Sequence, residues 1–381
     1  MIYVADVSSI GIQHEQFNAA FLALLQKANP NEKMLFFADG SHIEFQKSKL
    51  ENISFEQISI FNKRGGYQEF VRAYHQYKSL TKIVRKVEKF GGKSLFVLLI
   101  HPFAHFLFKL FNKSKLDVIL VMHGELESLK FNKHFVNKIW GWFLRSALLN
   151  VRPHVKYIIL GGSIHHNLLR VLPEFAKQKT TILDHPYPFE KQLDRNAAAE
   201  KRIVFSSIGV ATIHKYSHKF FEIAARVKQS AHGNAVKFNV SGRVYKDMEA
   251  HLNDDVNYKK DFGYYTREEL DAQLAESTFA VFYYDNANYS LCASGAFWDA
   301  INAELPFLYV HNDYFDHYSN LFGGIGMVFD TPEQLNSYIT KIAENGIPME
   351  QYKTYLANIR QLKADQIQGN ESGTALKALV A

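Results

Sequence analysis

The apolar residues of this chain fall into short runs, separated by stretches in which apolar positions recur every three or four residues. The first series of runs covers 2–4, 34–37, 53–61, 95–100, 116–121, 157–160 and 180–183. A second series covers 203–205, 236–240, 279–282 and 307–310. Short apolar runs predict buried strands, and the longer spacing predicts amphipathic helices between them. Strands that alternate with helices indicate an α/β fold with two doubly wound, Rossmann-like parallel sheets.

The two series are separated by a segment of different composition. His185-Pro186-Tyr187-Pro188 is followed by mostly polar residues up to Glu200, and closely spaced prolines favour extended backbone. A chain of 381 residues also exceeds the size at which a single core stops growing. We therefore expect a first domain at 1–185, a linker at 186–200 and a second domain at 201–381, whose last helix can pack back on the first domain.

Composition narrows the class of protein. Hydrophobic residues make up 47% of the chain, including 31 phenylalanines, which excludes a disordered protein. The single cysteine, Cys292, excludes an intrachain disulfide and suits a reducing compartment. No leader pattern opens the sequence, and His101, Pro102, His105 and Lys109 interrupt the most apolar stretch, 95–111. We expect a cytoplasmic protein without a transmembrane helix.

The net charge of +6 is unevenly distributed. One acid, Glu88, stands in 78–115 among the bases Lys78, Lys82, Arg85, Lys86, Lys89, Lys93, Lys109, Lys113 and Lys115. This segment fits attachment to an anionic membrane surface, such as the inner face of the plasma membrane, or an ordinary helix with a solvated basic face. Nucleic-acid binding is not expected, because no nucleic-acid-binding module accompanies the bases.

The helix expected after Pro102 has two different faces. His105, Lys109 and Lys113 recur at four-residue spacing and would share the solvent side. The other side would carry the apolar residues, which are Phe103, Phe106, Leu107, Leu110 and Phe111. This arrangement predicts that the bases face water and that the phenyl rings face the core.

The stretch 283–308 is the strongest candidate for a binding site. A strand ends near Phe282, and Ser294-Gly295 can begin a helix that runs to Asn302. The first amides of a helix have no internal partners, so those of Ser294, Gly295 and Ala296 could bind a phosphate. Asp299 lies one turn further and could accept hydrogen bonds from a ribose. The alternative is an ordinary helix cap followed by a first-turn acid.

The order of motifs beyond residue 200 resembles the nucleotide-binding domain of GT-B glycosyltransferases, in particular the retaining family four. The matching pieces are Gly209 with Lys215, the turn Val240-Ser241-Gly242, the turn Gly263-Tyr264-Tyr265 before Glu268-Glu269-Leu270, and Asp299-Ala300 with Pro306. The resemblance covers about residues 200 to 330, whereas the first half matches only by the order of its elements. It implies two such domains facing a cleft.

The resemblance also implies roles for individual residues. Gly209, Lys215, Ser294, Gly295 and Ala296 would bind the donor diphosphate, Asp299 the ribose, and Tyr264 and Tyr265 the base. The family's arginine and first glutamate are replaced by Val210 and Leu291, and Arg243 could supply the missing cation. His123 and Glu125 follow a strand of the first domain, where they could orient the sugar or accept a proton, and we take them as the catalytic candidates.

The resemblance and these residues together predict a glycosyltransferase that moves a sugar from a nucleotide-diphosphate sugar to a glycan or lipid-linked acceptor in surface polysaccharide synthesis. The resemblance further implies that the enzyme retains the anomeric configuration. Two alternatives stay open: a GT-B epimerase or phosphorylase, and a non-catalytic protein that binds a nucleotide or polyanion. We expect no cofactor and no metal. His165 and His166 point apart on a helix, and His101 with His105 lacks a third ligand.

Overall fold

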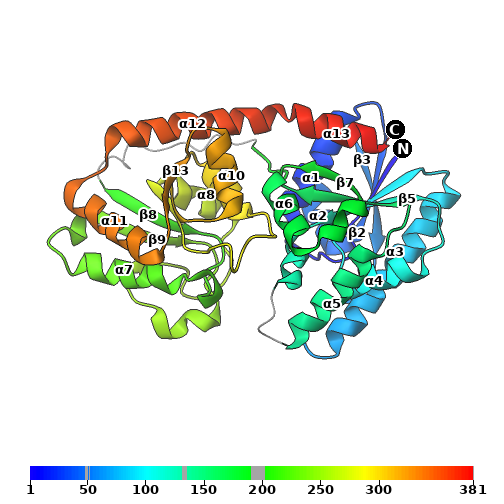
Figure 1. Cartoon of the computed structure of the whole chain (residues 1–381), viewed down its shortest axis with the longest axis horizontal. Helices are drawn as coiled ribbons and strands as arrows, with labels where there is room; N and C mark the ends of the chain where they lie inside the picture. Colours follow the sequence, from blue (N-terminus) through cyan, green and yellow to red (C-terminus); the bar gives the residue numbers. More distant parts are fainter. Residues whose placement is uncertain (48–49, 51, 131–134, 190–201, 381) are drawn as a thin grey trace. The chain divides into compact units, whose positions relative to one another are not determined.

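The computed structural model describes residues 1–47, 50, 52–130, 135–189 and 202–380, and it forms two compact units (Figure 1). The first unit contains Met1–Pro188, Leu291–Ala293 and Gly369–Ala381, and the second contains Phe189–Ser290 and Ser294–Gln368. Most of the predicted linker, 190–200, lies outside the described residues.

The first unit is built on a seven-stranded parallel sheet in the order β3-β2-β1-β4-β5-β6-β7. Its strands are β1 (Ile2–Ala5), β2 (Met34–Asp39), β3 (Ile53–Ile58), β4 (Ser94–Val97), β5 (Asp117–Met122), β6 (Val155–Leu160) and β7 (Lys179–Leu183). Its helices are α1 (Glu15–Ala28), α2 (Gly40–Lys47), α3 (Gln68–Lys89), α4 (Pro102–Phe111), α5 (Phe135–Leu149), α6 (Gly162–Val171) and α13 (Asn370–Val380), with the short 3-10 helices η1 (Gly124–Leu129) and η2 (Pro173–Lys177).

The second unit is built on a six-stranded parallel sheet in the order β10-β9-β8-β11-β12-β13. The strands are β8 (Ile203–Ile208), β9 (Val236–Ser241), β10 (Val256–Asn257), β11 (Phe279–Phe282), β12 (Phe307–Val310) and β13 (Gly326–Phe329). The helices are α7 (His218–Lys228), α8 (Arg267–Ala275), α9 (Gly295–Asn302), α10 (Asp313–Leu321), α11 (Pro332–Asn345) and α12 (Met349–Gln368), with the 3-10 helices η4 (Ile213–Lys215), η5 (Gly233–Ala235) and η6 (Lys246–His251).

Two parallel α/β sheets confirm the predicted fold class. The continuous apolar runs of the sequence become strands such as β4 and β11, in which every residue is buried, because helices cover both faces of each sheet. In each sheet the strand order reverses once, between β1 and β4 in the first and between β8 and β11 in the second. Open parallel sheets bind ligands outside the carboxyl ends of the strands at such a reversal.

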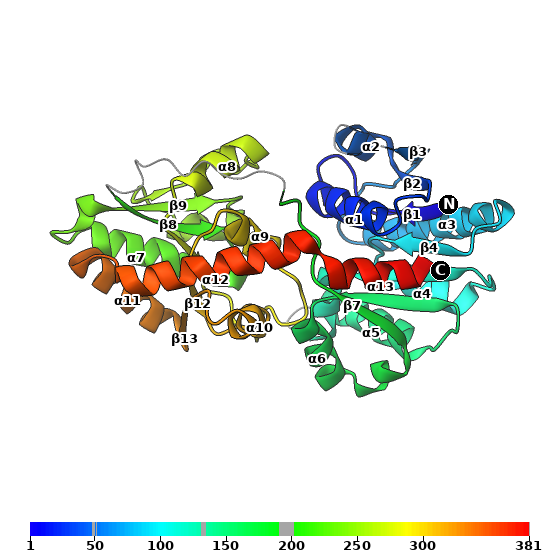
Figure 2. The same cartoon turned by 90° about the horizontal axis from the view of Figure 1, so that it is seen from above.

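The last helix, α13, belongs to the first unit. Its Leu376 is fully buried in the core cluster that β1, β2 and α1 form, and Ala375 and Leu379 pack against the same cluster. Figure 2 shows α13 alongside the first sheet. The helix therefore covers, together with α1, a sheet face whose residues come from the other end of the chain.

The orientation of α4 is opposite to the predicted one. His105 and Lys109 are 0% and 1% exposed, whereas Leu110 and Phe111 are 46% and 56% exposed. The His105 ring lies 3.0 Å from the Tyr157 hydroxyl, and the Lys109 ammonium lies 5.2 Å from the centre of the Tyr157 ring. Burial lowers the pKa of Lys109 to about 7. The hydroxyl and the ring face of the buried Tyr157 thus hold His105 and Lys109 inside, while Leu110 and Phe111 turn outward.

Candidate functional site

Three glycine-containing turns meet at the reversal of the second sheet. Gly209 follows β8 with φ of +90°, a conformation that suits glycine. A Cβ on Gly209 would lie 3.0 Å from the Cβ of Ala296 at the beginning of α9, and one on Gly242 would lie 1.9 Å from the Gly209 carbonyl oxygen. The missing side chains let the ends of β8 and β9 and the start of α9 approach one another at backbone distance.

The start of α9 is capped and open. The Ser294 hydroxyl accepts a hydrogen bond from the Phe297 amide at 3.2 Å, as expected for an N-cap, and it also bonds the Tyr284 hydroxyl at 3.0 Å. Gly295 is exposed, and a Cβ built on it would meet no atom within 4 Å. The first turn of α9 therefore has room for an anion over its amides.

Lys215 is brought to the same place by aromatic rings. Its ammonium lies 4.9 Å from the ring centre of Tyr284 and 5.1 Å from that of Tyr289, distances typical of cation–π contacts. The hydroxyl of Tyr284 in turn contacts Ser294. A residue that follows β8 is thus positioned beside the loop that leads to α9, as the predicted diphosphate site requires.

Arg243 faces the predicted base-binding turn. Its guanidinium donates to the Phe262 carbonyl at 3.0 Å and to the Tyr264 hydroxyl at 2.9 Å, and it stacks on the rings of Tyr245 and Tyr264. Tyr264 is 55% exposed, and Lys259 covers the neighbouring Tyr265 ring. Arg243 therefore shapes the turn that carries the tyrosines, and its assignment to the diphosphate stays a prediction.

Asp299 has a cationic partner that the sequence interpretation missed. Its carboxylate accepts a hydrogen bond at 2.7 Å from Arg267, which also pairs with Asp271 at 2.7 Å. Arg267 is the first residue of α8, directly after the Thr266–Glu269 capping box that the sequence predicted and the structure confirms. A cation in the first turn of a helix is unfavourable for the helix dipole, and this was the available signal that Arg267 has another task.

Leu291, at the position of the family's first glutamate, lies inside the protein. It is fully buried, and its amide donates to the carboxylate of Glu127, which belongs to the same unit. Ala293, two residues further, packs against the core of the first unit. The position at which the resembling family has an acid is thus an anchor of the loop, and no carboxylate replaces it there in the sequence.

In the first unit, the rings of His14, Phe17 and His185 surround the ring of His123. The His123 ring packs edge-on against Phe17, with the ring centres 4.0 Å apart. His14 and His185 have ring centres 5.4 and 6.1 Å from that of His123. Burial, followed by the nearby His14 and His185, lowers the pKa of His123 well below its ordinary value. His123 is therefore neutral at pH 7, and one nitrogen of its neutral ring can accept a hydrogen bond. The sequence interpretation placed His185 only in the connector and missed its ring contacts.

Glu125 is held close to His123 by the backbone. Its Oε1 accepts a hydrogen bond from the His123 amide at 3.0 Å, and its buried Oε2 has no hydrogen-bond partner among the described residues. Burial raises the pKa of Glu125 to about 7. The carboxyl group thus exchanges its proton near neutral pH, which suits an acid or a base.

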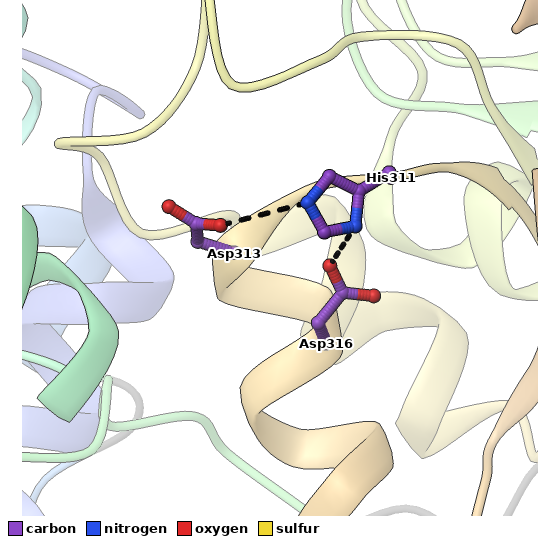
Figure 3. Close-up of side chains that lie close together, drawn as sticks. All are labelled: His311, Asp313 and Asp316. Carbon is purple, nitrogen blue, oxygen red and sulfur yellow. Dashed lines mark ion pairs between the residues drawn. The ribbon is translucent and has the colours of Figure 1, made fainter. Parts of the chain in front are cut away.

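One group of residues in the described part of the chain has the composition of a metal site (Figure 3). His311 Nδ1 lies 2.7 Å from Asp316, and its Nε2 lies 3.9 Å from Asp313. The carboxylates are already used: Asp316 accepts from the Tyr309 hydroxyl, and Asp313 accepts from the Asn286 amide at 2.8 Å. We interpret the group as a hydrogen-bonded brace that holds the loop after β11 against α10.

No helix in the part of the chain that the structure describes is both long and apolar enough to cross a membrane. Comparison with sequence families finds no matching family model, and no curated protein matches the chain.

Solved structures do match. The chain resembles Anabaena HepE in complex with UDP and glucose, with a TM-score of 0.66 and 10% identity over 96% of this chain and 95% of that one. It also resembles sucrose-phosphate synthase from Thermosynechococcus elongatus, with a TM-score of 0.63 and 10% identity over 100% of this chain and 95% of that one. A third match is an E. coli structure described as trehalose-6-phosphate bound with UDP-2-fluoro glucose. Its TM-score is 0.63 and its identity 10%, over 100% of this chain and 98% of that one. The chain therefore has the GT-B fold of these glycosyltransferases, as its sequence motifs predicted.

Proposed function

We propose that the protein is a glycosyltransferase that moves a sugar from a nucleoside-diphosphate sugar to a glycan or lipid-linked acceptor. One observation carries this proposal: Gly209, Lys215 and the open first turn of α9 lie together at the strand reversal of the second sheet. A cation and free amides at one place match a diphosphate leaving group, whose negative charge grows in the transition state. The fold supports the same activity.

The remaining roles follow from this placement. Asp299, oriented by Arg267, would accept hydrogen bonds from the ribose, and Tyr264 and Tyr265 would flank the base. His123 and Glu125 would orient the sugar or take the proton of the acceptor hydroxyl. We propose that the anomeric configuration is retained, as the resemblance implies, and that the protein acts in surface polysaccharide synthesis from the cytoplasmic side of a membrane.

The proposal is tested first by ligand-induced thermal stabilisation. A ligand at 100 times its Kd adds about 2.7 kcal/mol to the unfolding free energy, a readily measured shift in Tm. We would compare UDP-, GDP-, dTDP- and CMP-sugars, beginning with UDP-glucose because HepE was solved with UDP and glucose. If none of them raises the Tm, the nucleotide site is wrong.

The ribose contact has its own variant. Asp299→Ala removes the proposed hydrogen-bond acceptor, and we expect it to weaken binding of the stabilising nucleotide about tenfold, the loss of one charge-assisted bond of about 1.5 kcal/mol. Asp117→Ala is the matched control, because Asp117 also pairs with a cation at 2.7 Å but lies on the first sheet. An unchanged Kd in Asp299→Ala would show that the ribose lies elsewhere.

The buried Leu291 favours one alternative, a protein that binds the nucleotide without transferring the sugar. Incubation of a stabilising donor with candidate acceptors separates the two, because a transferase releases the nucleoside diphosphate and forms a glycosylated product. Incubation without an acceptor identifies an epimerase by isomerisation of the donor. Binding without any product would support the non-catalytic alternative.

A further inference from the structure

The outward face of α4 is part of a larger apolar surface on the first unit. The helices α3, α4 and α5 pack side by side, as Figure 1 also shows. Rings connect them: Tyr77 of α3 lies 6.4 Å from Phe111 of α4, and Phe106 of α4 lies 5.8 Å from Trp142 of α5, measured between ring centres. The most exposed large apolar and aromatic side chains of these helices, together with the residue before α3, are 46% exposed or more: Tyr67, Tyr74, Leu110, Phe111, Phe135 and Trp142. We name these six residues the aromatic face.

Basic residues are interleaved with this face. On α5 the exposed residues Phe135, Lys138, Trp142, Arg145 and Leu149 follow each other at three- and four-residue spacing, so that apolar and basic side chains share one stripe. The other exposed bases beside the face are Lys78, Arg85, Lys113 and Lys115. Within the described residues none of these six bases forms an ion pair, and α4 and α5 contain no acid.

This combination distinguishes among possible partners. The cores of protein–protein interfaces are poor in lysine, whereas the exposed rings of α5 alternate with a lysine and an arginine. Exposed tryptophan, tyrosine and phenylalanine on the same stripe as lysine and arginine match the boundary between lipid headgroups and acyl chains, because the rings enter the boundary while the bases contact phosphate. The unpaired bases provide charge complementarity to an anionic surface.

We propose that the aromatic face is the surface by which this protein binds an anionic lipid bilayer. The contact differs from the one that the sequence alone suggested. Only part of the basic run 78–115 belongs to the surface, because Lys109 is buried and Lys86 pairs with Glu56. The surface instead includes α5, which lies outside that run, and its contact requires both the rings and the bases.

The test uses the full chain and vesicles of known composition. We would measure co-sedimentation with phosphatidylcholine vesicles and with vesicles that also contain phosphatidylglycerol. Binding is expected to the anionic vesicles only and to weaken as salt is raised. Trp142 provides a second readout: it is 59% exposed, whereas Trp298 is fully buried, so emission should shift to the blue on binding through the tryptophans of α5.

Two double variants separate the ring and charge contributions. Phe135→Ser with Trp142→Ser removes exposed rings, and Lys138→Glu with Arg145→Glu reverses two exposed charges. We expect each to lower the vesicle partition coefficient at least tenfold. Lys341→Glu with Lys377→Glu is the matched control, because both lysines are exposed, on α11 and on α13. Equal binding by all three variants, or no binding by the unaltered chain, would overturn the proposal.

Measuring the Tm of the α5 variants with and without nucleotide checks their folding and also tests the lipid surface and the transferase activity separately. All four altered side chains of α5 are exposed, so the variants should keep the Tm of the unaltered protein and any nucleotide-induced shift. Vesicle binding without a nucleotide response would support the lipid surface and contradict the transferase. Binding to acidic protein or nucleic acid in place of anionic vesicles would assign the face to another partner and contradict the lipid surface.

Discussion

At the carboxyl edge of the second sheet, glycines, helix amides and a lysine lie together, whereas at the same edge of the first sheet imidazole rings and a buried carboxyl group lie together. In the proposed function, the groups of the second unit would compensate the negative charge of a diphosphate without exchanging protons. In the first unit, burial keeps His123 neutral at pH 7, whereas Glu125, whose pKa is raised to about 7, can exchange its proton there. From this comparison we propose that charge stabilisation belongs to the second unit and proton transfer to the first.

Among the predicted effects, the largest is expected from removing Lys215, the cation of the second unit. Lys215→Ala deletes the cation while the α9 amides stay, and we expect kcat/KM for donor to fall about 10–100-fold, since a charge-assisted contact contributes about 1.5–3 kcal/mol. Lys341→Ala is the control, because it deletes an exposed lysine of the same unit. If the two variants have the same activity, Lys215 does not contact the diphosphate.

The close approach of the turns is tested by adding one methyl group. In Gly209→Ala the new Cβ would lie 3.0 Å from Ala296 at the helix start. Gly346→Ala is a control with a similar φ, +82° against +90°, but its Cβ would meet no atom within 4 Å. We expect both to lose about 1 kcal/mol of stability through backbone strain.

Only Gly209→Ala should also weaken donor binding, by about tenfold, because it moves the amides of α9. Isothermal titration with the stabilising nucleotide measures this difference. Equal affinities in the two glycine variants would show that the approach of β8 to α9 does not shape the site.

The raised pKa of Glu125 in the first unit predicts a pH-dependent unfolding free energy, an effect smaller than those of the Lys215 and Gly209 variants. The pKa of Glu125 is raised from 4.5 to about 7, so the folded chain keeps a proton that the unfolded chain releases. Between these values the contribution of Glu125 to stability falls as pH rises, and above about pH 7 it is constant. His185, with its pKa lowered from 6.5 to about 4, acts in the opposite direction between pH 4 and 6.5.

The variant Glu125→Gln isolates the carboxyl group from the histidines. The difference in unfolding free energy between the unaltered protein and Glu125→Gln should fall from pH 4.5 to 7 and then level off. Denaturant unfolding at half-unit pH intervals measures it, and His185→Gln serves as the comparison, with its difference changing below pH 6.5 in the other direction. A pH-independent difference for Glu125→Gln would mean that the carboxyl group titrates normally.

Local sequence determined much of this protein. Apolar runs and helical spacing are properties of neighbouring residues, so they predicted two parallel sheets and the start of α9 at Ser294-Gly295, and Thr266 with Glu269 predicted the cap of α8. The carboxyl ends of parallel strands meet at one edge, and for this reason Gly209 and the α9 turn could be predicted as neighbours.

Tertiary packing decided what the sequence pattern left open. The pairing of Arg267 with Asp299 joins two helices, and the ring contacts of His185 join residues from three segments. Spacing along α4 identified two faces but not which one is buried, because that depends on Tyr157 of a distant strand, which receives His105 and Lys109. The side of a helix that faces water depends on the residues that pack against the helix. Those residues lie elsewhere in the chain, so the spacing within the helix cannot reveal them.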